Sequence, residues 1–201
     1  VFAALTERQG QLRDLIVTAP EPLRSELRPL TRGRLLKRLA AVQPSRHRDV
    51  ELRGTLYALR SVARRIEHLT AEERELETEI SALTRKLAPH LLDEPGVGTL
   101  AAAQLLLSWS HPGRVRGEAA FARLAGCAPI PASSGQTIRY RLDRSGDRQL
   151  NRALHMILVT RRRWHQPTID YIARRRTDGK SSREANRCLK RYLARNLYRL
   201  L

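Results

Sequence analysis

The most regular apolar pattern in the chain runs from residue 52 to residue 87, and residues 55–88 contain neither proline nor glycine. Most apolar positions recur in alternating steps of four and three, the spacing of a coiled-coil seam, which predicts one long amphipathic helix. At ~1.5 Å per residue this helix is roughly 50 Å long. We expect the seam to pair with a second copy of the chain; packing on the preceding segment of the same chain is the alternative. The apolar positions are Leu52, Leu56, Leu59, Ala63, Ile66, Leu69, Leu76, Ile80, Leu83 and Leu87.

The predicted fold class is mainly α, with the coiled-coil helix of residues 50–88 between two different segments. Residues 1–49 predict short helical pieces broken by prolines, a connector with no convincing core of its own. Residues 89–201 predict a compact helical domain with a short β-strand or hairpin after Ser134. Its expected elements are helices over 116–124, 146–164 and 182–200, the last burying Tyr192, and a half-buried strand over 137–143 with Ile138, Tyr140 and Leu142 on its apolar face.

A glycine-containing turn follows the long helix, in the sequence Pro95-Gly96-Val97-Gly98. It is similar to the turn of a helix-hairpin-helix, in which two short helices flank a backbone that can approach a phosphate closely. Gly96 and Gly98 are therefore candidate nucleic-acid-binding residues. A plain turn between two packed helices is an equally good interpretation, since no lysine or arginine lies at the turn itself.

The charge of the chain points to a polyanionic partner. The 201 residues include 38 lysines and arginines against 20 aspartates and glutamates, a net charge of +18. Residues 89–201 hold 21 of the basic and 8 of the acidic side chains, so most of the excess lies there. A solvated arginine-rich surface explains part of this bias, and nucleic acid is the first candidate for the remainder. The candidate binding residues are Arg144, Arg148, Arg152, Arg187, Lys190, Arg191 and Arg195.

Other classes of protein find little support. No apolar run approaches the ~18 residues of a membrane span, so no membrane partner is expected. Cys127 and Cys188 stand alone, without the spacing of a disulfide framework or a zinc site. We interpret the aspartates as caps, turns or salt-bridge partners, and expect neither metal nor cofactor in this chain. These aspartates are Asp14, Asp49, Asp93, Asp143 and Asp147.

One short loop is a candidate for chemistry. Ser133-Ser134-Gly135 is followed by Arg139, Arg141 and Arg144. A serine hydroxyl can attack a phosphate whose oxygens are held by arginines. Attack on an ester would need an oxyanion hole and a histidine base, and the sequence shows neither a Gly-x-Ser-x-Gly elbow nor a triad-like histidine pattern. On the local sequence alone, Ser-Ser-Gly is more often a plain turn.

Four motifs in one order carry a resemblance to a known family. They are Pro95-Gly96-Val97-Gly98, Phe-Ala-Arg-Leu-Ala-Gly-Cys-Ala-Pro at 121–129, Ser134-Gly135, and Gly-Asp-Arg-Gln-Leu-Asn-Arg-Ala-Leu at 146–154. Together they resemble the carboxy-terminal domain of the IS110 group (IS116/IS110/IS902) of insertion-sequence transposases, over about residues 90–201. The preceding coiled-coil helix and proline-rich connector also fit that family's layout.

The resemblance implies a recombinase that is guided by a bridge RNA encoded in the element. The serine of the Ser-Gly pair attacks a DNA phosphate and forms a transient covalent link; here that serine is Ser134, with Ser133 as the fallback and Arg139 and Arg141 near the scissile phosphate. The implied partners are DNA, guide RNA and further copies of the chain, as a dimer or tetramer through the coiled coil. The implied location is the bacterial cytoplasm, at the nucleoid.

Family members also bear an amino-terminal nuclease-like domain with four carboxylates and Mg²⁺. No carboxylate quartet can be assigned in this sequence, which begins at Val1, so we expect a fragment that is catalytically inactive alone, with Mg²⁺ belonging to the other domain. The alternative function is a non-catalytic nucleic-acid-binding module, in which a helix-hairpin-helix grips nucleic acid, the coiled coil dimerises and Ser134 is dispensable.

Overall fold

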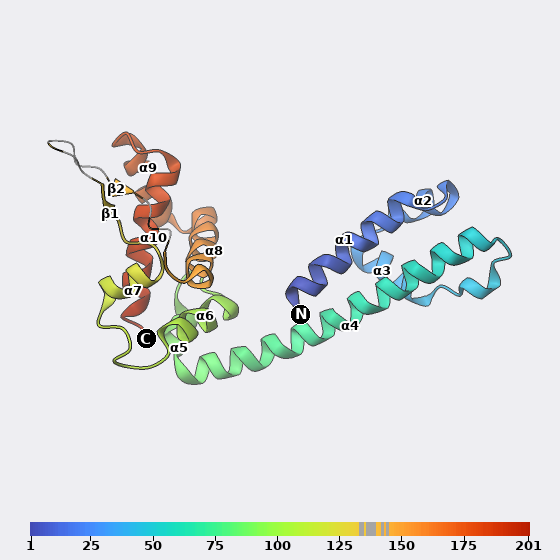
Figure 1. Cartoon of the computed structure of the whole chain (residues 1–201), viewed down its shortest axis with the longest axis horizontal. Helices are drawn as coiled ribbons and strands as arrows, with labels where there is room; N and C mark the ends of the chain where they lie inside the picture. Colours follow the sequence, from blue (N-terminus) through green and yellow to red (C-terminus); the bar gives the residue numbers. More distant parts are fainter. Residues whose placement is uncertain (133–134, 136–139, 142, 144) are drawn as a thin grey trace. The chain divides into compact units, whose positions relative to one another are not determined.

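The computed structural model describes residues 1–132, 135, 140–141, 143 and 145–201. Within these residues the chain is mainly α-helical with one small two-stranded sheet, which confirms the predicted fold class (Figure 1). The chain divides into two compact units, Val1–Leu76 and Glu77–Leu201, and each is described by itself.

The first unit contains three short helices and most of one long helix. Prolines punctuate it as the sequence predicts: Pro20 precedes the second helix and Pro22 lies in its first turn, where a missing amide hydrogen costs no helical hydrogen bond. The long helix α4 has 38 residues, begins here and ends in the second unit. The elements are α1 (Phe2–Thr18), α2 (Glu21–Leu27), α3 (Arg32–Ala41), the 3₁₀ turn η1 (Pro44–Arg46) and α4 (Val50–Leu87).

The first half of the predicted coiled-coil seam is buried within the same chain. Leu59 and Ile66 of α4 are fully buried in one apolar cluster with Leu12, Leu27 and Leu39 from the three preceding helices. Residues 1–49 therefore contribute to a core that they share with α4. The intrachain alternative applies to this half of the seam.

The second half of the seam has a different environment. Leu76, Leu83 and Leu87 are 46%, 59% and 70% exposed. Apolar side chains at this spacing suit a helical partner, so the expected pairing of two copies stays a prediction and now concerns this half of α4.

The second unit is a helical bundle around α10. Helix α10 contacts α7, α8 and α9, and α6 packs on α8 (Figure 1). The core is built from leucine, isoleucine, alanine, Val97 and Phe121, and Phe121 is fully buried. The predicted helices at 116–124, 146–164 and 182–200 are confirmed with ends shifted by two residues or fewer, whereas α9 was not predicted. The elements are α5 (Pro89–Asp93), α6 (Thr99–Trp109), α7 (Glu118–Leu124), α8 (Arg148–Trp164), α9 (Gln166–Thr177) and α10 (Ser182–Tyr198).

The sequence predicts a short strand or hairpin after Ser134; of the two described strands only the second follows Ser134, and the first was not predicted. Ile138 and Leu142 lie outside the described residues. Strands β1 (Ile130–Pro131) and β2 (Tyr140–Arg141) are antiparallel, with Ile130 opposite Arg141 and Pro131 opposite Tyr140. The half-buried face was wrong where it can be checked, because Tyr140 is 63% exposed. A ribbon of two short strands does not bury a face unless another layer packs on it. The prediction that Tyr192 is buried in the core was also wrong, because its side chain lies beside α9 and is 46% exposed.

We predict that Leu59→Ala lowers the free energy of unfolding by about 2–5 kcal/mol, because it opens a cavity where α4 meets α1–α3. Urea unfolding followed by circular dichroism measures the change. Val50→Ala, on the same helix but 70% exposed, is the control and should shift stability by less than about 1 kcal/mol. Equal effects of the two substitutions would contradict the shared core.

Candidate nucleic-acid interface

An open cavity of about 590 Å³ lies in the second unit, between α8, α10 and the loop before α8. Five cationic side chains line it, and we call this cavity the basic groove. Four of the five were predicted as nucleic-acid contacts, and Arg183 was missed because it precedes the part of the last helix where arginines recur most densely. The five cations are Arg148, Arg152, Arg183, Arg187 and Lys190.

Two aspartates organise the loop that enters the groove. Asp147 caps α8 by accepting hydrogen bonds from the amides of Gln149 (2.8 Å) and Leu150 (3.0 Å). Asp143 accepts bonds from the amide (2.8 Å) and hydroxyl (2.5 Å) of Ser145, forming a turn. These contacts confirm the interpretation of both aspartates as cap and turn residues.

Hydrogen bonds keep both carboxylates ionised. The hydroxyl and amide of Ser145 hold the pKa of Asp143 below its ordinary value. Burial raises the pKa of Asp147, but the hydroxyl of Ser108 (2.5 Å) and the α8 amides outweigh it, so the net shift is downward. Two fixed negative charges therefore lie beside the cations of the groove.

Two glycines let this loop approach the end of α7. Gly146 has φ +106°, and a Cβ there would lie 2.5 Å from the carbonyl oxygen of Leu124. Gly126 has φ +61°, and its Cβ would lie 2.9 Å from the carbonyl oxygen of Ser145. The amide of Asp147 donates to the Leu124 oxygen (2.7 Å) across the same contact. Only glycine combines these backbone angles with this approach.

Asn151 ties the groove together. Its side-chain nitrogen Nδ2 donates to the carbonyl oxygen of Ala125 (2.6 Å), and its side-chain oxygen Oδ1 accepts from Nζ of Lys190 (2.9 Å). One side chain thus links α8, the segment after α7, and α10. The ammonium of Lys190 is held in place by this bond, whereas Arg148, Arg152 and Arg187 have exposed side chains.

The Ser133-Ser134-Gly135 segment, which we call the serine loop, follows β1 in the sequence. Ser133, Ser134, Arg139 and Arg144 lie outside the described residues. Arg141 in β2 is exposed and lines a second cavity, of about 690 Å³, together with Arg187 and Arg191. Because Arg187 lines both cavities, the basic groove adjoins the base of the hairpin.

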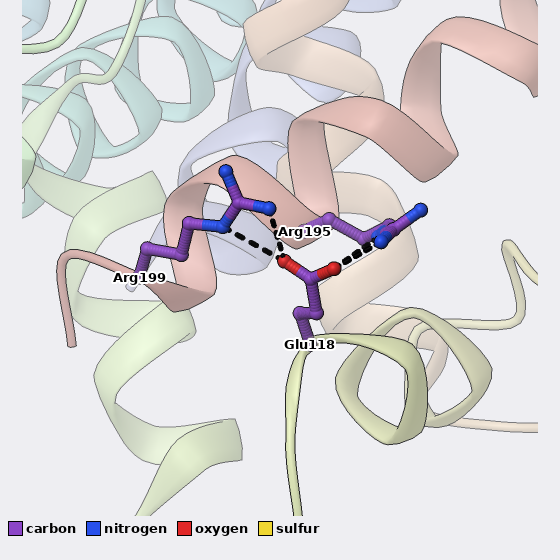
Figure 2. A network of polar contacts seen from close by, with 3 residues as sticks. All are labelled: Glu118, Arg195 and Arg199. Carbon is purple, nitrogen blue, oxygen red and sulfur yellow. Dashed lines mark hydrogen bonds and ion pairs between the residues drawn. The ribbon is translucent and has the colours of Figure 1, made fainter.

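The carboxyl end of α10 is engaged by an acidic residue. Arg195 and Arg199 both hydrogen-bond to Glu118 at the start of α7 (Figure 2). Hydrogen bonding from Arg195 is the main reason that the pKa of Glu118 lies below its ordinary value. Among the predicted contacts, Arg195 is therefore already paired within the protein and lies apart from the residues lining the basic groove.

The Pro-Gly-Val-Gly turn joins α5 to α6 as predicted. Gly96 has φ +75° and packs under Arg161, whose Cγ would lie 3.0 Å from an added Cβ. Arg161 is buried, and donates from Nε to the carbonyl oxygen of Pro95 (2.5 Å) and from Nη2 to Glu94 (2.8 Å). The sequence therefore missed a cation at this turn, but one that is spent on holding it against α8. Gly98 is exposed, so a phosphate contact there stays a prediction.

Neither a metal-ligand cluster nor a membrane-spanning helix occurs in the described parts of the chain. They contain no group of three or more histidines, cysteines or carboxylates placed to hold a metal ion. Nor does any helix among these residues combine the length and apolarity needed to cross a membrane.

A helical unit with an open groove lined by five cations is a surface suited to a polyanion. Residues 88–174 match the model of the family described as Transposase IS116/IS110/IS902. The insertion element IS110 uncharacterized 43.6 kDa protein of Streptomyces coelicolor is 33% identical over 136 residues, which cover 66% of this chain and 34% of that protein. The chain thus spans about a third of the length of the curated relative that it matches. By both comparisons the chain is similar to proteins of the IS110 group of insertion elements.

We predict that Gly146→Ala lowers the free energy of unfolding of the second unit by about 2–4 kcal/mol, from backbone strain and collision with Leu124. Trp109 and Trp164 are the two tryptophans of the chain, so urea unfolding followed by tryptophan fluorescence reports this unit. Gly179→Ala is the control. Gly179 has φ +80°, but an added Cβ would meet no atom of a non-neighbouring residue within 4 Å, so backbone strain alone should lower the free energy of unfolding by about 1 kcal/mol. Equal losses would refute the close approach.

Proposed function

We propose that this chain is part of a DNA transposase and that the basic groove holds the phosphates of its nucleic acid. The observation that carries the proposal is the gathering of Arg148, Arg152, Arg187 and Lys190 in one groove, from helices that are far apart in the sequence. Guanidinium and ammonium groups contact phosphates without regard to base sequence. The groove is therefore a positioning surface, and the choice of DNA target falls to the guide RNA.

Strand transfer is assigned to the serine loop. Oγ of Ser134, or of Ser133 as the fallback, loses its proton and attacks a DNA phosphorus. The phosphorus–oxygen bond to the leaving strand breaks, and the leaving oxygen takes up a proton to become that strand's hydroxyl. Arg139 and Arg141 stabilise the charge that develops on the phosphoryl oxygens. The resulting phosphoserine ester conserves the energy of the broken phosphodiester bond. A hydroxyl of a second strand can therefore displace the serine and rejoin the DNA.

The metal chemistry and the association of copies involve residues beyond the groove. Mg²⁺ chemistry belongs to the carboxylate-bearing domain of family members. Association into a dimer or tetramer through Leu76, Leu83 and Leu87 would bring two serine loops to one DNA, and the protein would act on DNA in the bacterial cytoplasm.

A binding module without chemistry is the second candidate. The five cations of the groove need no serine to hold a phosphate backbone, which favours this function. The two candidates share the groove and differ in whether a covalent protein–DNA link forms.

We predict that alanine at Arg148, Arg152 or Arg187 weakens duplex DNA binding by the whole chain and flattens its salt dependence. Each lost phosphate contact should reduce the slope of log K against log salt by about one unit. Titrations at several salt concentrations, followed by fluorescence anisotropy, measure this slope. Arg13→Ala, an exposed arginine on α1, is the control and should leave the slope unchanged. A wild-type slope in all three groove variants would exclude this surface.

We predict that Ser134→Ala abolishes covalent capture of DNA when the chain is combined with the carboxylate-bearing domain of an IS110 relative and its guide RNA. A radiolabelled DNA that carries a nicked or strained phosphodiester reveals the covalent product on a denaturing gel. Ser133→Ala is the matched control and should retain capture. Undiminished capture in the Ser134 variant would transfer the role to Ser133 or remove the chemistry from this loop.

A further inference from the structure

The second cavity differs from the basic groove in its aromatic lining. It lies between the described ends of the hairpin, the end of α9 and the face of α10, and has a volume of about 690 Å³. Tyr140 and Tyr192 line it together with cations that include Arg141, Lys180 and Arg191. Its carboxylate, Glu184, is already bonded to the hydroxyl of Ser181 (2.7 Å) in a helix-capping pair. The cavity therefore offers aromatic faces and positive charge together.

These tyrosines bring two of the chain's few aromatic rings into one cavity. Only nine of its 201 residues are aromatic, five of them tyrosine, yet two lie in one cavity with 63% (Tyr140) and 46% (Tyr192) of their surface exposed. Aromatic side chains generally stabilise a protein by burial. Exposed rings gathered beside cations in a polyanion-binding unit call for a ligand that has a flat face and a negative charge.

One of the two rings is held by the protein. The ring of Tyr171 on α9 meets Tyr192 edge to face, with 5.9 Å between centroids and 73° between planes. Arg175 fixes Tyr171 in turn, donating from Nε to its hydroxyl (3.2 Å) with its guanidinium carbon 5.4 Å from the ring centre. Tyr192 thus lines the cavity with its ring packed on one side against Tyr171, and 46% of its surface is exposed.

We propose that this second cavity takes an unpaired nucleotide, with its base stacked on Tyr192 or Tyr140 and its phosphate held by Arg141, Lys180 and Arg191. Stacking on aromatic rings beside cations is how proteins hold single strands, because an unpaired base exposes its face whereas a duplex hides it. The inference rests on the proposed function. Arg187 lines both cavities, so a duplex in the basic groove and an unpaired nucleotide here can belong to one nucleic acid.

The test compares the binding of the whole chain to three ligands of equal charge: an unstructured single strand, the same strand with abasic positions, and a duplex of matched phosphate number. Abasic positions keep the phosphates and remove the stacking faces. We expect the abasic strand to bind about 5- to 100-fold more weakly than the intact strand. DNA and RNA versions of the single strand distinguish the two sources of an unpaired nucleotide, and a preference for either supports the cavity.

Substitutions locate the effect. Tyr192→Leu should weaken binding of the intact single strand by about fivefold or more, leave the abasic strand and the duplex unchanged, and be rescued by Tyr192→Phe. Tyr57→Leu is a matched control: Tyr57 lies on α4 in the first unit, is also 46% exposed, and also has an arginine near its ring (Arg60, 5.0 Å). It should change none of the affinities.

The outcomes separate this inference from the function on which it rests. If the duplex binds but the intact and abasic strands bind equally, the nucleotide cavity is refuted and the basic groove stands. If Tyr192→Leu weakens the duplex as much as the single strand, Tyr192 acts through the fold and the stacking role is refuted. If no nucleic acid binds at physiological salt, both proposals fail. The comparison of intact and abasic strands uses the wild-type chain, so it holds even where a variant does not fold.

Discussion

The close contact between residues 145–147 and the end of α7 is the constraint on which the arrangement of the second unit's charged surface depends. Gly126 and Gly146 allow the two backbones to meet, and the Asp147 amide closes the contact on the Leu124 carbonyl. From that point Asp147 starts α8 with its side chain. The first turns of α8 thereby lie beside α10, and the basic groove forms between them.

Acidic residues pair with some of the arginines of this unit and leave others exposed to solvent. Glu118 binds the arginines at the end of α10, and Glu94 with the Pro95 carbonyl binds Arg161. Those cations brace the bundle. At the other end of α10 the cations line two adjoining cavities. The basic residues of this unit thus fall into two groups in the structure: arginines paired with carboxylates inside the bundle, and cations that line the two cavities.

The sequence predicted more of the fold than of the site. Periodicity located α4, α8 and α10 to within a few residues, because their apolar faces repeat with the helical period. It could not say what covers the seam of α4, since Leu59 looks the same against a second copy or against Leu39. It also misplaced Tyr192, whose spacing matches the core but whose ring lies at the edge between α9 and α10. Among the arginines, only tertiary contacts distinguish Arg195, held by Glu118, from Arg187, which lines both cavities.

The central claim is that nucleic acid lies in the basic groove, and chemical protection of arginines tests it most directly. The whole chain, free and bound to duplex DNA, is modified with phenylglyoxal and its modified positions are located by mass spectrometry. We expect DNA to protect Arg148, Arg152, Arg183 and Arg187, while Arg13 on α1 reacts equally in both states. Unchanged reactivity of the four groove arginines in a sample shown to be DNA-bound would contradict it.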